Sequence, residues 1–529
     1  MSETVQPIVL GRDATPPASV VGAKAAELAR MMALGLRVPA AFALPTRLCA
    51  GVIADDPAAL AAMRNAAAAG ITSLEAATGK RFGDARTPLL VSVRSGAERS
   101  MPGMLDTVLD VGLNPATLHG LIRQSGDVRL AFDSYRRFLF AYAETVCAAP
   151  TGAFEAALAR LLQTEGVADE AELDSEALER LAGEYRALAE RLSATPSDDP
   201  MEQLVACARA VYKSWEIPRA REYRRLNGLE GLSGTAVTVQ AMVFGNSGAD
   251  SGAGVAFSRN PATGEKALYI DFLSDAQGED VVSGRRTPGD AAELSRRMPG
   301  IARELEAGAR LLESAHSEVQ DIEFTVERGL LYFLQARSAK RTPQAALKIA
   351  VDLVGEGVIS RAQALERLAS VDLAATRVGR FAAAAKAAAH ATVASPGVAC
   401  GRVCFDSLRA RALADAGEPV ILVRRDTSTD DIEGFAVASG VLTAVGGRTS
   451  HAAVVARQMG KVCLVGCLGL NVDADSREAM IGSTRIREGD WIALDGSSGD
   501  VSVGRREVVF ADAPEAAVIS QWREGEAPR

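Results

Sequence analysis

Four histidines are the only imidazole groups in the 529-residue sequence, and one of them lies in a context that suits chemistry. His119 and His316 lie in polar helical segments and His390 in an alanine-rich one, where exposed or structural roles are expected. His451 follows GGRTS and precedes AAVVARQMG. That pattern is typical of a glycine turn, an N-capping Ser/Thr pair and a short helix that ends at Gly460. The pattern therefore predicts an imidazole at a helix N-terminus.

A histidine in this position can carry phosphate. Free backbone N–H groups and the positive end of the helix dipole stabilise a phosphoryl group there, and Arg448 can add a charge-assisted contact. A purely structural histidine at a helix cap is the alternative interpretation. The adjoining glycines and the basic residue favour the catalytic one, so we expect a phosphohistidine at His451.

Two predicted strands, VQDIEFTVE and LLYFLQAR, bring a second set of polar groups together. Strand alternation places Asp321 and Glu323 on one face of the first, and Gln335 and Arg337 on one face of the second. Carboxylate and amide oxygens suit Mg²⁺, whose remaining ligands are usually water and nucleotide phosphates. Arg337 can then hold the phosphoryl group that is transferred. A solvent-facing strand with an ordinary ion pair is the other interpretation of this spacing.

A third set of residues could contact phosphates. The glycines of GNSGADSGAG, residues 245–254, allow backbone amides to approach an anion closely. No GxxxxGK[ST] motif is present, and a plain hairpin loop fits the same residues. Lys24 in the first predicted helix and Arg94 in VSVRSG are candidate phosphate contacts, although a single basic residue is ordinarily a solvated charge.

The elements that must position these groups change in character along the chain. Residues 20–110 mix helix and strand signals, and residues 115–227 have the periodicity of a helical insert. Strand alternation returns over residues 230–340. The chain is therefore expected to be an α/β and α+β multidomain protein.

The remaining third of the sequence predicts a linker, a domain and a tail. Residues 341–388 are interpreted as a helical linker that includes most of the alanine-rich FAAAAKAAAHAT. Residues 389–510 contain several strands and the helix after His451, which predicts a small β/α domain. Residues 511–529 are charged, and no fold is expected for them.

Composition limits the classes of function. Hydrophobic residues make up 48% and charged residues 24%, and the length suggests roughly three to four structural units. A formal net charge of -9 argues against a broad nucleic-acid-binding surface. Without a transmembrane stretch or a signal-peptide pattern, we expect a cytoplasmic protein with no membrane partner.

Seven cysteines, an odd number, are expected to be reduced thiols. The CxxxC pairs Cys400/Cys404 and Cys463/Cys467 could bind a metal by spacing alone. Both pairs lie in strand-like apolar sequence without a suitably placed histidine, so we do not expect a metal site there.

The segment LTAVGGRTSHAAVVARQMGK resembles the phosphohistidine motif of pyruvate phosphate dikinase and related phosphoenolpyruvate-utilising enzymes. VSVRSGAERSMPGMLDTVLDVGLN, SWEIPRAREYRRLN, GTAVTVQAMVFGNSGADSGAGVAFSRNPATGEKALY, DAQGEDVVSGRRTP and VQDIEFTVERGLLYFLQAR look like successive segments of that family's ATP-grasp part. The resemblance covers nearly all of residues 20–510. It implies an ATP-grasp domain at 1–340, with 115–227 as a helical insert, and a swivelling β/β/α phosphohistidine domain at 389–510.

The resemblance also implies roles for individual residues. It assigns nucleotide-site positions to Lys24, Arg94, Gln240, Met242, Val243, Glu279 and Arg337. It places Asp321, Glu323 and Gln335 in the Mg²⁺-binding region. His451 matches the histidine that is transiently phosphorylated, and Thr449 matches a position that a regulator phosphorylates in some members.

The family's first half-reaction uses ATP and inorganic phosphate and yields AMP, pyrophosphate and a phosphohistidine. Its histidine domain must then swing between distant sites, which the linker at 341–388 could permit. Other members of the family continue into a large (β/α)₈ barrel that binds phosphoenolpyruvate and pyruvate, for which 529 residues leave no room. The usual GGKGANL near the start is VGAKAAEL here, which keeps the lysine and loses glycines.

We therefore expect an ATP-dependent, dikinase-type phosphotransferase that uses Mg²⁺. Its acceptor would be held by a separate barrel subunit or would be a small molecule. The alternative is a phosphocarrier or regulatory ATP-binding module without substrate turnover. The sequence leaves open whether the protein forms a homodimer.

Overall fold

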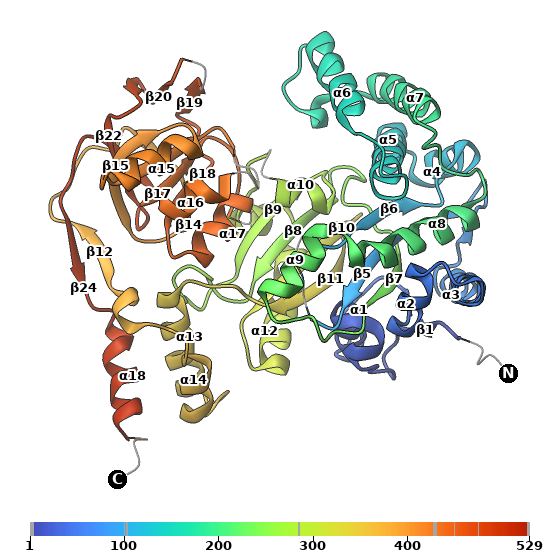
Figure 1. Cartoon of the computed structure of the whole chain (residues 1–529), viewed down its shortest axis with the longest axis horizontal. Helices are drawn as coiled ribbons and strands as arrows, with labels where there is room; N and C mark the ends of the chain where they lie inside the picture. Colours follow the sequence, from blue (N-terminus) through green and yellow to red (C-terminus); the bar gives the residue numbers. More distant parts are fainter. Residues whose placement is uncertain are drawn as a thin grey trace. The chain divides into compact units, whose positions relative to one another are not determined.

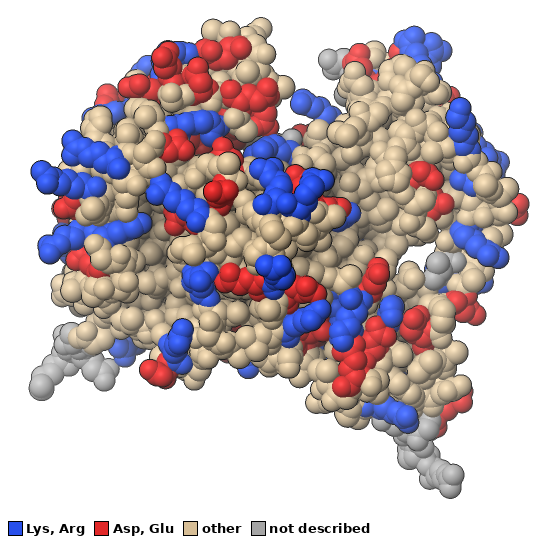
Figure 2. All heavy atoms as spheres, turned by 180° about the vertical axis from the view of Figure 1, so that it is seen from behind, with Lys and Arg blue, Asp and Glu red and all other residues tan. Residues whose placement is uncertain are grey.

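A computed structural model describes residues 5–99, 101, 104–283, 286–426, 431–448, 450–473 and 476–525. The chain divides into two units, of which unit 1 comprises residues 1–249 and 332–335, and unit 2 comprises residues 250–331 and 336–529. Within the described ranges, no helix has the length and apolar character needed to cross a membrane. Figure 2 shows basic and acidic side chains interspersed over the face that it displays.

Unit 1 is organised around a five-stranded sheet with the order β1-β2-β7-β5-β6. Its strands are β1 (Ile8–Val9), β2 (Ala41–Leu44), β5 (Val91–Ala97), β6 (Thr107–Val111) and β7 (Thr235–Ala241). Strand β7 lies at the centre of the sheet, and all of its residues are buried. It pairs antiparallel with β5, so that Arg94 lies opposite Thr238. A separate parallel pair is formed by β3 (Arg81–Phe82) and β4 (Pro88–Leu89).

Nine α-helices accompany this sheet in the described part of unit 1 (Figure 1). The first three are α1 (Ala18–Ala33), α2 (Cys49–Ile53) and α3 (Pro57–Thr78). The predicted insert at 115–227 is helical, and it comprises α4 (Pro115–Ser125), α5 (Val128–Thr145), α6 (Gly152–Glu165), α7 (Ser175–Arg191), α8 (Pro200–Lys213) and α9 (Pro218–Leu226). Local signals explain these boundaries, because Asp127, Asp174 and Asp199 each cap a helix by accepting a backbone N–H.

Unit 2 begins with a four-stranded sheet in the order β11-β10-β8-β9. Its strands are β8 (Gly252–Phe257), β9 (Tyr269–Ser274), β10 (Gln320–Glu327) and β11 (Leu330–Ser338). The strands expected between residues 230 and 340 are therefore confirmed. The expectation omitted three helices in the same stretch, which are α10 (Gly278–Ser283), α11 (Ala291–Arg297) and α12 (Pro299–His316). Buried Ile301, Leu305 and Leu312 give α12 the apolar stripe of a packed helix.

Two glycines of the GNSGADSGAG segment belong to β8 and serve packing. A Cβ on Gly252 would lie 2.2 Å from the ring of Phe272, and a Cβ on Gly254 would lie 2.5 Å from the ring of Phe324. These two rings stack on each other, with centroids 6.1 Å apart and planes at 4°. Part of the glycine-rich pattern therefore reflects a close approach of β8 to an aromatic pair.

Three helices share the next apolar core of unit 2: α13 (Pro343–Gly355), α14 (Arg361–Arg367) and α18 (Pro514–Gly525). Helix α18 lies in the segment 511–529, for which no fold was expected, so that expectation was wrong. Ile519 of α18 is fully buried in the same cluster as Leu347 and Leu353 of α13. The segment folds because it has a long-range partner, which its own composition does not reveal.

Helices α13 and α14 are present in the first half of the segment 341–388, as expected, but the second half is not helical. The strand β12 (Val378–Phe381) pairs antiparallel with β24 (Val508–Ala511), and no helix forms over the alanine-rich residues that follow. The strand β13 (Ala389–His390) then pairs with β23. Strand pairing on both sides of the segment outweighs the helix propensity of alanine.

The last part of unit 2 contains an eight-stranded sheet in the order β13-β23-β22-β15-β16-β17-β18-β14. Its further strands are β14 (Thr392–Ser395), β15 (Val398–Cys404), β16 (Val420–Arg424), β17 (Gly440–Thr443), β18 (Val462–Val465), β22 (Trp491–Asp495) and β23 (Asp500–Val503). A separate antiparallel sheet contains β19 (Leu470–Asp473), β20 (Glu478–Ile481) and β21 (Thr484–Arg487). The strands and helices expected within residues 389–510 are thus present, and these residues belong to unit 2 together with residues 250–331.

Strands β15 to β18 run parallel to one another, and three helices accompany them. These are α15 (Ser407–Asp415), α16 (Ile432–Val437) and α17 (His451–Gln458) (Figure 1). The loop after β17 leads directly into α17. His451 therefore begins a helix at the carboxyl edge of a parallel sheet, where open α/β sheets usually bind ligands.

We predict that replacing Ile519 by Ala lowers the free energy of unfolding by about 2 to 4 kcal/mol, because a fully buried side chain would leave a cavity between α18 and α13. The matched control is Leu408→Ala, which truncates a side chain that is 78% exposed and should change stability by less than about 0.5 kcal/mol. Urea denaturation measures both. Equal midpoints for the two variants would contradict the packing of α18.

Candidate functional site

Lys24 follows a break in α1 that only glycine can make. Gly22 has φ 80° and ψ 156° inside the helix, and a Cβ on it would lie 1.9 Å from the carbonyl oxygen of Gly96. A Cβ on Gly96 would in turn lie 3.8 Å from the Cβ of Lys24. The lysine is thereby held beside the end of β5, the strand that carries Arg94. VGAKAAEL has lost glycines relative to GGKGANL, but it keeps the one that this contact requires.

Arg94 is oriented by two neutral amides. Its Nη1 lies 3.5 Å from Oε1 of Gln240, and its Nη2 lies 3.5 Å from Oε1 of Gln335. Gln240 is buried, and its Nε2 donates to the carbonyl of Pro39 at 3.3 Å. Because amides are neutral, these two hydrogen bonds orient the guanidinium without offsetting its charge. Gln335, which the sequence grouped with the magnesium ligands, accepts this hydrogen bond from Arg94.

Met242 and Val243 follow the end of β7 and are half-buried. The N–H of Met242 donates to the carbonyl of Leu90 at 2.9 Å, which extends the sheet pairing by one residue. Two half-buried apolar side chains at the end of a central strand form a surface that suits an aromatic base.

The glycine-rich loop after these residues is anchored to the helical insert. Asn246 is buried, and its Nδ2 donates to Oδ2 of Asp133 in α5 at 3.4 Å. Burial alone would raise the pKa of Asp133, but the charges of Arg136 and Arg137 lower it to about 2. The carboxylate therefore stays ionised, and the insert determines where the loop begins.

In unit 2, Asp321, Glu323 and Arg337 come together as the strand alternation predicted. Nε of Arg337 donates to Oδ2 of Asp321 at 2.8 Å, and its Nη2 lies 3.9 Å from Oε1 of Glu323. Burial raises the pKa of Asp321, and the positive charge of Arg337 opposes that effect. The two carboxylates raise the pKa of Arg337 despite its own burial, so the guanidinium stays charged.

These residues fit a magnesium ion in part. Oδ1 of Asp321 is buried and has no hydrogen-bond partner within the described ranges, so it has a lone pair to offer. Mg²⁺ is usually held by one or two carboxylates, with water and phosphate oxygens completing its octahedron. No group of three or more His, Cys, Asp or Glu residues suited to a metal occurs in the part of the chain that the structure describes. Glu279, the other acidic residue assigned to the site, is exposed in the first turn of α10.

The helix predicted after GGRTS is present, and its first residue is His451. Its N-cap is Ser450, but the expected capping hydrogen bond is not formed by that side chain. Thr449 lies outside the described residues. The N-cap position was thus predicted correctly, but the prediction that its hydroxyl forms a capping hydrogen bond was wrong.

The loop before His451 is held by a buried arginine of α17. Arg457 is 2% exposed, and its Nη1 donates to the carbonyls of Ala394 at 2.9 Å and of Arg448 at 2.7 Å. The N–H of Ser450 donates to the carbonyl of Gly447 at 3.1 Å, which closes a turn. Sequence reasoning missed Arg457, and its only signal was a charged residue on an otherwise apolar helix face.

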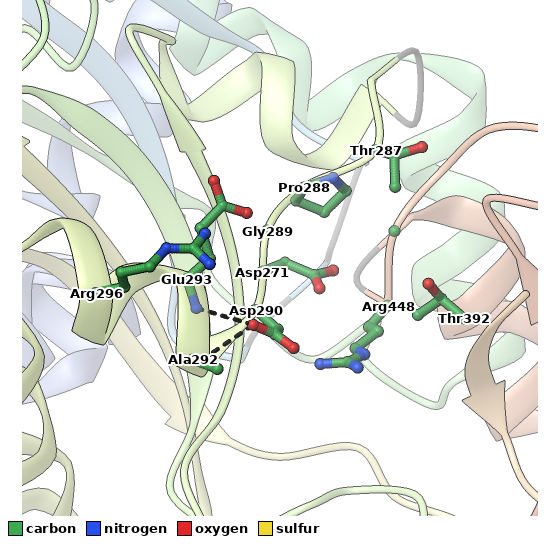
Figure 3. Close-up of a pocket in the computed structure, with 11 residues that line it drawn as sticks. Asp271, Thr287, Pro288, Gly289, Asp290, Ala292, Glu293, Arg296, Thr392 and Arg448 are labelled. Carbon is green, nitrogen blue, oxygen red and sulfur yellow. Dashed lines mark hydrogen bonds between the residues drawn. The ribbon is translucent and has the colours of Figure 1, made fainter. Parts of the chain in front are cut away.

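The same loop lines a cavity of about 310 Å³ in unit 2. Figure 3 shows the side chain of Arg448 extending toward Asp271 and Asp290, and its guanidinium carbon lies 4.7 Å from the ring centroid of Tyr269. A Cβ on Gly447 would lie 2.3 Å from Pro288 and 2.9 Å from the carboxylate of Asp271. The second glycine of GGRTS is therefore needed for a close approach, a role that the sequence did not reveal.

Comparison with protein families gives two matches along the chain. The model described as "Pyruvate phosphate dikinase, AMP/ATP-binding domain" matches residues 59–303. The model described as "PEP-utilising enzyme, mobile domain" matches residues 416–499, which include His451. Arg94, Gln240, Met242, Val243 and Glu279 lie within the first match, whereas Lys24, Asp321, Glu323, Gln335 and Arg337 lie outside both matches.

Curated relatives agree with these matches. Pyruvate, phosphate dikinase of Clostridium symbiosum is 43% identical over 492 residues, which are 92% of this chain and 56% of the relative. Pyruvate, phosphate dikinase 1 of Arabidopsis thaliana is 42% identical over 511 residues, 95% of this chain and 53% of the relative. Pyruvate, phosphate dikinase 2 of Zea mays is 43% identical over 492 residues, which are 92% of this chain and 56% of the relative. The chain spans about half the length of these relatives.

We predict that Asp133→Asn destabilises the protein by about 2 kcal/mol at pH 7, because one pKa unit of depression corresponds to about 1.4 kcal/mol. A lowered pKa gives stability that is complete above the ordinary value of 3.8 and is lost as the pH falls toward about 2. The cost of the substitution should therefore be clearly smaller at pH 3 than at pH 7 in urea unfolding followed by helical circular dichroism. The same cost at both pH values would mean that charge does not hold this network.

Proposed function

Since the chain belongs to the pyruvate phosphate dikinase family, we propose that it is an ATP-dependent, dikinase-type phosphotransferase that carries phosphate on His451. The observation that carries the proposal is the placement of His451 as the first residue of α17, at the carboxyl edge of parallel strands. Backbone N–H groups at that helix end favour a negatively charged group.

The proposed nucleotide site belongs to an ATP-grasp domain at residues 1–340. Lys24 and Arg94 neutralise phosphate oxygens, and Gln240 keeps the Arg94 guanidinium aligned through the hydrogen bond described above. Met242 and Val243 contact the adenine with their half-buried side chains. Glu279, in the first turn of α10 in unit 2, is assigned to nucleotide binding by the family resemblance alone.

Mg²⁺, when bound, would supply positive charge that offsets the negative charge of the phosphoryl group during transfer. Asp321 and Glu323 would hold it, whereas the side-chain oxygen of Gln335 accepts a hydrogen bond from Arg94. Arg337 is kept in line by Asp321 at 2.8 Å and stays charged, so it can hold the phosphoryl group as it moves.

In the proposed half-reaction an imidazole nitrogen of His451 forms a bond to the β-phosphorus of ATP. The bond from that phosphorus to the α-bridging oxygen breaks, and AMP leaves. Inorganic phosphate then takes the terminal phosphoryl group, which forms pyrophosphate and leaves one phosphoryl group on the histidine. The swivelling domain at 389–510 passes this group to an acceptor on a partner subunit or to a small molecule.

We predict that ATP labelled at its β-phosphate transfers an acid-labile label to His451 of the purified chain in the presence of Mg²⁺ and phosphate. AMP and pyrophosphate should each form to about one equivalent and stop there until an acceptor is added. Mass spectrometry and ³¹P NMR measure the product. Label that persists in His451→Ala, or that comes only from the γ-position, would refute the dikinase assignment.

We further predict that Glu323→Ala and Arg337→Ala each slow labelling by on the order of 10² to 10³, because the first removes a proposed Mg²⁺ ligand and the second removes the positive charge that would hold the transferred group. Residues 389–510 should stay folded in both variants, since the two substituted residues belong to β10 and β11. Arg341→Ala is the matched control: it breaks an ion pair with Glu318 at 2.8 Å and should label at the native rate. Native rates in both site variants would remove these residues from the proposed site.

A further inference from the structure

Ser450 is an N-cap residue whose side chain does not cap its helix. It precedes His451 and is 4% exposed, and the structure shows no hydrogen bond from its side chain to the first turn of α17. Its Oγ is buried without a hydrogen-bond partner among the residues that the structure describes. A serine at this position normally accepts a hydrogen bond from a backbone N–H of the first turn.

Leaving a buried hydroxyl unsatisfied costs free energy, so buried polar side chains without a partner are uncommon and require a reason. The hydroxyl is not retained because it supports the loop. The backbone N–H of Ser450 donates to the carbonyl of Gly447 at 3.1 Å, and Arg457 holds the carbonyl of Arg448 at 2.7 Å. The loop is therefore held by backbone groups and by Arg457, while the Ser450 hydroxyl takes no part.

A second polar atom of the same loop is also buried without a hydrogen-bond partner among the described residues. Nε of Arg448 is buried and has no hydrogen-bond partner in the described part of the chain. Two unsatisfied polar groups thus lie within three residues of His451, one a hydroxyl and one a guanidinium N–H. Both can donate a hydrogen bond, and donors of this kind suit the oxygens of an anion.

We propose that the hydroxyl of Ser450 donates a hydrogen bond to the phosphoryl group carried by His451, together with the first-turn N–H groups of α17. The inference rests on the proposed function, because it requires a phosphohistidine at this position. In the unphosphorylated protein the hydroxyl has no hydrogen-bond partner among the described residues, and the phosphoryl oxygen supplies one. Ser450 is then a phosphoryl-binding residue, and its normal capping role is taken over by the ligand.

Two serine variants separate this role from a structural one. Ser450→Ala loses no hydrogen bond in the unphosphorylated protein, so it should melt no lower than the native chain. Its labelling from β-labelled ATP should be slowed about 10- to 100-fold, and its phosphohistidine should hydrolyse faster. Ser407→Ala is the control, because the Ser407 hydroxyl does have a partner, Asp431, at 3.0 Å in the same domain. That variant should melt lower and label at the native rate. Ser450→Thr keeps a hydroxyl and should recover most of the labelling.

Each outcome has a definite meaning. Native labelling at His451 with equal rate and equal phosphohistidine lifetime in Ser450→Ala would overturn the role of Ser450 and leave the proposed function intact. A native chain that takes no label at His451 would overturn both. A lower melting temperature of Ser450→Ala would assign the hydroxyl to the fold. If Ser450→Ala only raised the phosphate concentration needed for half-maximal rate, the hydroxyl would bind free phosphate instead, and the proposal would fail.

Discussion

The hydrogen bonds of the Arg457 guanidinium hold together the part of the molecule on which the proposed chemistry depends. Arg457 is buried in α17 and donates to two carbonyls, one in β14 and one in the loop before His451. Its burial lowers its pKa, while the nearby groups Tyr269 and Asp271 oppose that effect. A buried charge is tolerated only when it is fully hydrogen-bonded. The loop cannot move away from α17 without leaving this charge unsatisfied.

Buried charges serve as anchors elsewhere too. Arg259 at the end of β8 is completely buried and binds Glu313 of α12 at 2.7 Å and Glu356, next to α13, at 2.8 Å. Asp133 plays the same part between α5 and the glycine-rich loop. The charges proposed for chemistry differ, because Lys24, Arg94, Glu323 and Arg337 are only half-buried. Removal of a buried partner in an anchor costs stability, whereas partly exposed charges stay available to a ligand.

Local patterns were enough to predict much of the fold and several features of the candidate site. Helix caps and apolar periodicity predicted the insert at 115–227, and strand alternation predicted that Asp321, Glu323 and Arg337 would meet. The GGRTS pattern predicted that a helix begins at His451. These features depend on residues a few positions apart, where sequence spacing and geometry are directly linked.

What tertiary structure alone decided involves partners that are distant in the sequence. Helix α18 exists because α13 offers it an apolar surface, and the alanine-rich segment is not helical because β12 and β13 pair with strands more than 100 residues away. Gln335 contacts Arg94 across 241 positions. The sequence by itself determined which residue types stand at His451 and at the strands, since local spacing encodes them. Only the folded chain decided that the hydroxyl of Ser450 has no hydrogen-bond partner among the described residues, because hydrogen-bond satisfaction depends on neighbours in space and not on spacing along the chain.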